Sequence, residues 1–186
     1  GETNVLNRLL SAGKYTLTAY NKPDQVTVAN NTASVNATSA KHINPMPGYL
    51  FASVQDINVV ADDTLRVTAR MKQLIRRLNL ELTATEGDYS RVQSATATLS
   101  GVASVANMAT GERSAAAQVT NTFRQDGNKF TLLFRLLGIV TTEAQTLTVD
   151  ITFNNGDTQQ IVSDVTESMK NFNNEAEPIK LKGNLL

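Results

Sequence analysis

The stretch LTVDITF, residues 147–153, is followed at once by NNGD, residues 154–157. Its large apolar residues alternate with Thr148, Asp150 and Thr152, and a β-strand sends successive side chains to opposite faces. This segment therefore predicts a strand with one buried face and one solvent-facing face. The Asn-Gly pair that follows favours the positive φ angles of a tight hairpin turn. The same alternation recurs along the chain and predicts an all-β, antiparallel fold class.

Further alternating segments lie on both sides of this hairpin. In the first part of the chain, the predicted strands are residues 14–20, 26–29, 34–37, 49–54, 57–60 and 65–69. In the second part they are residues 76–82, 92–99, 102–106, 115–123, 130–137, 147–153, 158–162 and 177–181. Residues 41–48 contain two prolines and are predicted to form an irregular loop.

Residues 71–82 keep both helical and strand spacing, and we favour a strand from about residue 76, preceded by a short connector. This connector divides the chain into an abbreviated N-terminal β-sandwich domain, residues 1–72, and a C-terminal β-sandwich domain, residues 73–186. One short helix is predicted within residues 164–172. There Asp164 and Glu167 have capping-box spacing, and Val165, Met169 and Phe172 share a helical face.

The composition contains few of the residues that catalytic and metal-binding sites require. Lys plus Arg and Asp plus Glu both number 17, so no net charge attracts nucleic acid or an anionic membrane. The chain has no cysteine and a single histidine, His42, which excludes an ordinary zinc site. No Gly-x-Ser-x-Gly motif accompanies His42, which we interpret as a solvated loop residue. We therefore predict a non-enzymatic protein and assign no catalytic residue, metal ligand or cofactor.

Two groups of side chains are candidates for binding. Tyr20, Tyr49 and Tyr89 lie at predicted strand ends or turns, where their rings could contact a glycan, although packed rings with wet hydroxyls are equally expected there. They support an alternative function as a glycan-binding adhesin module. A second group is basic, and we interpret it as a solvated strand face at the domain junction. It consists of Arg66, Arg70, Lys72, Arg76 and Arg77.

Several stretches resemble the fimbrillin-associated anchor and minor-subunit lipoproteins of Bacteroidales-type fimbriae. They are AGKYTLTAYN at residues 12–21, TLSGVA at 98–103, TGE at 110–112, FRLLG at 134–138 and QTLTV at 145–149. The resemblance implies tandem transthyretin-like Greek-key β-sandwiches, the first of them a candidate for an incomplete one. It also implies a cell-surface protein of the outer membrane, held there by an upstream lipidated cysteine that is not among these residues. The expected partners are other fimbrial subunits.

The resemblance suggests a mechanism that strand physics supports. A sheet lacking one strand exposes unpaired backbone groups and apolar side chains, which a strand of another subunit can cover. We expect an incomplete sheet in the first domain, with Leu17 as a candidate subunit contact. The strand carrying Ile179 and Leu181 is a candidate for donation outward, although pairing within its own domain is at least equally expected.

Overall fold

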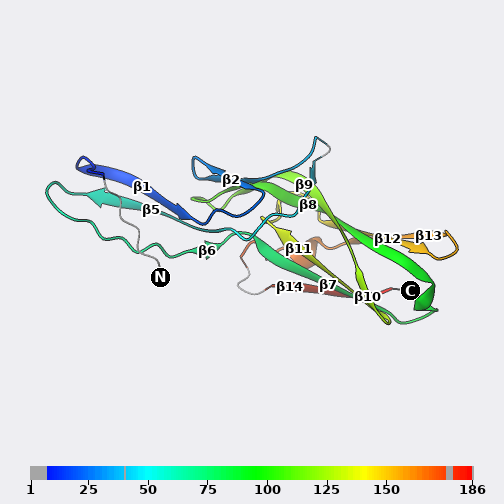
Figure 1. Ribbon diagram of the computed structural model, residues 1–186. Helices are drawn as coiled ribbons and strands as arrows, with labels where there is room; N and C mark the ends of the chain where they lie inside the picture. Colours follow the sequence, from blue (N-terminus) through cyan, green and yellow to red (C-terminus); the bar gives the residue numbers. More distant parts are fainter. Residues whose placement is uncertain (1–7, 40, 175–177, 186) are drawn as a thin grey trace.

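The computed structural model describes residues 8–39, 41–174 and 178–185 (Figure 1). Its strands are β1 (Gly13–Tyr20), β2 (Val26–Ala29), β3 (Thr32–Val35), β4 (His42–Ile43), β5 (Phe51–Val59), β6 (Lys72–Gln73), β7 (Arg76–Ala84), β8 (Val92–Asn107), β9 (Arg113–Thr122), β10 (Arg124–Asp126), β11 (Lys129–Leu136), β12 (Thr146–Phe153), β13 (Thr158–Asp164) and β14 (Ile179–Leu185). The described residues add a 3-10 turn, η1 (Tyr89–Arg91), and one short helix, α1 (Thr166–Met169). The predicted all-β fold class is confirmed.

Two sheets pack face to face in the second part of the chain. One has the order β10-β11-β7-β14. In the other, β13 pairs with β12, β12 pairs with the long strand β8, and β9 pairs along the opposite edge of β8. The alternation seen in the sequence explains this packing, because β7 buries Leu78, Leu80 and Leu82 while β12 buries Val149 and Ile151. These side chains belong to a single hydrophobic core, so both sheets are held by one apolar layer.

Strand β8 joins the first part of the chain to the second. Sequence analysis predicted two strands here, and that prediction was wrong, because a bulge continues one strand of 16 residues past Gly101. The first half of β8 pairs with β12, and its last residues pair with β3, which forms a hairpin with β2. Residues 26–35 therefore share a sheet with residues 92–107. The proposed division at residues 72 and 73, which β6 spans, stays a prediction.

A thin arm extends away from this body (Figure 1). It consists of the β1–β5 antiparallel ribbon, with β6 pairing only at Phe51 and Ala52 of β5. No residue of β1 is fully buried, and the hydrophobic core formed by the described residues includes none from β1 or β5. The arm is therefore a small sheet in which Ala52 is buried and the apolar side chains of β1 are only partly covered.

Two sequence predictions in the arm were wrong. Residues 51–59 form one continuous strand, β5, where two strands were predicted at residues 49–54 and 57–60. Asp56 lies within it and accepts a hydrogen bond from Thr16 Oγ1 at 3.0 Å across the ribbon, which keeps this polar pair in register. Residues 65–69 alternate as a strand would, yet they form no strand. Gln55 Nε2 of β5 donates a hydrogen bond to the Thr68 carbonyl at 3.3 Å. Leu65 and Val67 remain exposed.

The short helix also differs in detail from its prediction. Met169 and Phe172 are buried as expected, but the capping box is absent because the helix begins one residue later, with Val165 at its N-cap. Asp164 Oδ1, one residue before the N-cap, instead accepts a hydrogen bond at 2.8 Å from the backbone N–H of Thr166, the first residue of the helix. The predicted loop at residues 41–48 likewise contains β4, two residues that pair in parallel with β9.

The outward face of β12 provides a first prediction. Asp150 is half-buried there and accepts a hydrogen bond from Gln160 Nε2 at 2.7 Å, so Asp150→Leu removes one exposed-face interaction and adds apolar surface. We expect aggregation with a change in the free energy of unfolding of no more than about 1.5 kcal/mol. Light scattering together with a melting curve checks this. A soluble monomer at the parent's concentration would contradict it.

Candidate functional site

The outer edge of β1 is the main candidate for an interaction site. Among the described residues β1 pairs only with β5, from Gly13 opposite Val59 to Tyr20 opposite Ala52. Alternate backbone N–H and C=O groups along the other edge are therefore available to a further strand. Leu17 lies in the middle of β1, half-buried, on the ribbon face that also carries Tyr15 and Ala19. The edge thus combines free backbone groups with a partly covered apolar face.

The C-terminal strand is already engaged within the chain. Strand β14 pairs in parallel with β7, with Ile179 opposite Leu78 and Leu181 opposite Leu80. Both β14 side chains are half-buried and pack against the main core. Within the described residues, Ile179 and Leu181 therefore contact their own sheet and core, as in a strand paired within its own chain.

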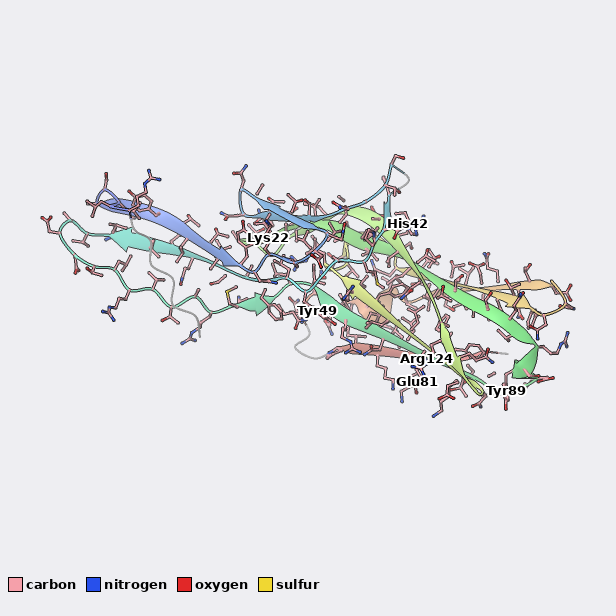
Figure 2. All side chains as sticks on the ribbon, viewed as in Figure 1. Lys22, His42, Tyr49, Glu81, Tyr89 and Arg124 are labelled. Atoms are coloured by element: carbon pink, nitrogen blue, oxygen red, sulfur yellow. The ribbon has the colours of Figure 1, made fainter. Side chains whose placement is uncertain are left out.

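The three candidate tyrosines do not gather at one place. Tyr20 ends β1 and is 45% exposed, while Asn21 Nδ2, next to it, donates to the Tyr49 carbonyl at 2.8 Å. This hydrogen bond brings the backbone at Tyr49 close in space to the residue that follows Tyr20. Tyr89 belongs to η1 and lies well away from Tyr49 (Figure 2). The three rings therefore do not form one site, and Tyr89 would belong to a separate one.

Within the described residues, His42 belongs to no cluster of side chains that could hold a metal ion. The His42 ring is half-buried on β4, not in a solvated loop, and its Nε2 lies 3.0 Å from Thr120 Oγ1. Thr120 Oγ1 is in turn 2.8 Å from Thr98 Oγ1. In the described part of the chain, no three His, Cys, Asp or Glu side chains group together so that they could hold a metal ion.

A groove of about 400 Å³ lies on the outer face of the four-stranded sheet. Its polar lining comes from Arg77, Asn79 and Glu81 on β7, Thr131 on β11 and Lys180 on β14. None of the three candidate tyrosines lines it. Sequence analysis did not predict this site, because its residues come from strands that are distant in the chain. Of the basic cluster singled out in the sequence, only Arg77 lines the groove.

An ion pair lies across the groove. The Lys180 Nζ is 2.5 Å from Glu81 Oε2. Glu81 is labelled in Figure 2. The hydrogen bond from Lys180 is the main cause that lowers the pKa of the Glu81 carboxyl. Desolvation opposes it, and the positive charges of Lys180, Lys182 and Lys129 add to the lowering. Three lysines from two other strands therefore surround this carboxylate.

The Glu81 carboxyl gives a pH prediction. Because its pKa in the folded chain lies below the ordinary 4.5, the pair stabilises the fold above pH 4.5, and this contribution is lost as the pH falls through the lowered pKa. In Lys180→Gln we expect the Glu81 pKa to return toward 4.5, measured by NMR titration of the carboxyl carbon. Lys182→Gln, which removes only a weaker attraction, is the control. Equal shifts in both variants would contradict the ion pair.

Comparison with solved structures supports the architecture. A candidate adhesin from Bacteroides ovatus superimposes with a TM-score of 0.69 at 13% identity, covering 95% of this chain and 76% of that one. A candidate polysaccharide-binding protein from Bacteroides thetaiotaomicron gives 0.60 at 10% identity, covering 95% and 69%. The fimbrial anchor protein Mfa2 from Porphyromonas gingivalis gives 0.57 at 12% identity, covering 94% and 69%. At these identities the similarity establishes a shared fold.

Family membership comes from the sequence itself. A comparison with curated proteins gives no match. No helix within the described residues has the length and apolar character needed to cross a membrane. The model of the fimbrillin-A associated anchor proteins Mfa1 and Mfa2, in contrast, matches residues 1–184, nearly the whole chain. The chain therefore belongs to the fimbrillin-A associated anchor protein family of Mfa1 and Mfa2, which is a family of cell-surface fimbrial proteins and not a class of enzymes.

Proposed function

We propose that this chain is a fimbrial anchor or assembly subunit that accepts a strand of another fimbrial subunit along the outer edge of β1. The free edge of β1 is the observation that carries this proposal, since β1 pairs only with β5 in the described part of the chain. Backbone hydrogen bonds along the edge would set the register of the incoming strand. Its alternate side chains would cover Tyr15, Leu17 and Ala19, which are half-exposed in the isolated chain.

The arm suits an acceptor better than the C-terminal strand suits a donor. Releasing β14 would break its ladder with β7 and expose Ile179 and Leu181, which pack on the core. Adding a strand to β1 breaks no pairing recorded in the described residues and covers apolar surface, which is favourable at about 25 cal/mol per Å². We therefore assign the acceptor role to β1 and an intramolecular role to β14.

We also propose that the full-length protein is attached to the outer membrane through a lipid anchor, as the resemblance to the lipoproteins of this class implies. Lipid attachment would hold the arm at the cell surface, where fimbrial subunits arrive. Metabolic labelling of the full-length protein with palmitate in its own cells tests this part separately. Labelled protein in the membrane fraction supports the anchor, and unlabelled protein contradicts it.

Site-specific photo-cross-linking tests the acceptor role. A benzoylphenylalanine at position 17 of the full-length protein, expressed in its own cells, is expected to yield a covalent product with a fimbrial subunit, identified by mass spectrometry. The matched control is position 162, because Val162 is an exposed apolar residue on another edge strand, β13. Cross-links to a fimbrial subunit from position 162 but not from position 17 would contradict the proposal.

A further inference from the structure

The outer face of the four-stranded sheet carries a large excess of positive charge. Side chains directly opposite one another on neighbouring strands share a face, so the register places six basic residues on this one. They are Arg77, Arg124, Lys129, Arg135, Lys180 and Lys182, hereafter the basic face. Among the described residues, two carboxylates, Glu81 and Asp126, share it by the same register, so the described part of this face has an excess of four positive charges. Because the whole chain has a formal net charge of zero, this excess is a local feature that composition conceals.

Two of these cations face each other across β7 and β11, and neither forms an ion pair with a carboxylate of the described residues. Arg77 on β7 lies directly opposite Arg135 on β11, and like charges at opposed positions destabilise a sheet. Arg77 Nη2 donates to the neutral Asn79 side chain at 3.2 Å, and the Arg135 guanidinium lies 5.8 Å from the centre of the Tyr49 ring. Neither contact supplies negative charge. An anion bound between the two guanidinium groups would relieve their repulsion.

The basic face also carries neutral hydrogen-bonding groups and an aromatic ring. The groove runs beside Arg77 and Lys180, and Asn79 and Thr131 add neutral hydrogen-bonding groups to its lining. Tyr49, half-buried beside Arg135, places an aromatic ring at the Arg135 end of the face. Cations, neutral donors and an aromatic ring together match a sugar polymer that carries carboxylates, because arginine pairs with carboxylates through two parallel hydrogen bonds.

We propose that the basic face binds a linear acidic polysaccharide whose uronate carboxylates pair with Arg77 and Arg135 while its sugar rings lie along the groove. A flat anionic bilayer is a poorer match. The part of the face around Arg77 and Lys180 is a groove, and the exposed large apolar residues of the described chain, among them Leu65, Val67 and Val162, lie on other elements. Glu81 limits the affinity, since its carboxylate repels the polymer and occupies Lys180 at 2.5 Å. This surface is separate from the β1 edge and requires no second subunit.

Binding of the purified chain to immobilised polygalacturonate, measured by biolayer interferometry, tests the proposal. We expect saturable binding that weakens as salt is raised, and none to neutral dextran. Arg77→Gln and Arg135→Gln should each lower the affinity about tenfold, because each removes a charge-assisted pair. Glu81→Gln should raise the affinity severalfold, a gain that misfolding cannot produce.

Matched controls separate this surface from charge in general. Arg66 and Arg70 are exposed cations outside the basic face, on the stretch between β5 and β6, so Arg66→Gln and Arg70→Gln should leave the affinity unchanged. Equal losses in all four arginine variants, equal binding to dextran, or an affinity lowered by Glu81→Gln would overturn the proposal. Binding to phosphatidylserine vesicles without binding to polygalacturonate would overturn it in favour of a membrane contact.

Discussion

Ile151→Asp is expected to unfold the sandwich or bring it close to unfolding. Ile151 is 1% exposed, pairs with Ala95 on β8 and points into the core shared by the two packed sheets. An aspartate there loses the apolar contacts and buries a charge that has no partner. The expected loss is about 3–5 kcal/mol, a large fraction of the stability of a typical domain. Urea denaturation followed by circular dichroism measures it.

The neighbouring residue supplies the control for this substitution. Thr152 is half-buried on the outward face of the same strand, so Thr152→Asp places the same charge within reach of water. We expect a loss of no more than about 1 kcal/mol for Thr152→Asp. Similar losses in the two variants would contradict the assignment of the two faces, and with it the packing of β12 on the core.

Gly101→Ala is expected to lower the free energy of unfolding by an amount second only to that of Ile151→Asp among the substitutions proposed for this chain. Gly101 has φ +70° at the bulge of β8, and a Cβ there would lie 2.6 Å from the Ala144 carbonyl oxygen and 2.9 Å from Gln145 Nε2. The left-handed backbone costs an alanine about 1–2 kcal/mol, and the overlap with the Ala144 carbonyl and the Gln145 side chain adds about 1–3 kcal/mol. Gln145 is 1% exposed, so this contact has little room to relax.

Gly111→Ala isolates the steric part of that loss. Gly111 has φ +82° but no atom within 4 Å of a built Cβ, so only the backbone strain applies there. The difference in the free energy of unfolding between the two alanine variants should be about 1–3 kcal/mol, with Gly101→Ala the less stable. Equal stabilities would mean that the bulge tolerates a side chain and does not hold residues 138–145 against β8.

The alternation of apolar and polar residues correctly predicted strands that bury one face in the core. Leu78, Leu80 and Leu82 identified β7 against a competing helical pattern, because a strand with one buried face leaves a period of two in the sequence. The same pattern misled at residues 65–69, since alternation reports a capacity to pair and not the presence of a partner. The continuity of β8 was missed because the glycine that suggests a break instead forms a bulge.

The candidate sites were less predictable than the fold. The free edge of β1 could be anticipated in outline, because the first part of the chain offers too few strands for a closed sandwich. The basic face could not, since Arg77, Arg135 and Lys180 become neighbours only through the register of β7 with β11 and β14. Each occupies a polar position of its own strand, where an isolated cation is unremarkable. Long-range register, which the sequence does not encode locally, brings them together.

Residue-resolved hydrogen exchange along β1 tests most directly whether this chain offers an unfilled strand position. In the isolated protein, we expect alternate amides between Gly13 and Tyr20 to exchange rapidly while those bonded to β5 are protected. After assembly with a fimbrial subunit the rapidly exchanging set should become protected, with the amides of β14 unchanged. Uniform protection of β1 in the isolated protein, or no change along β1 on assembly, would contradict the account.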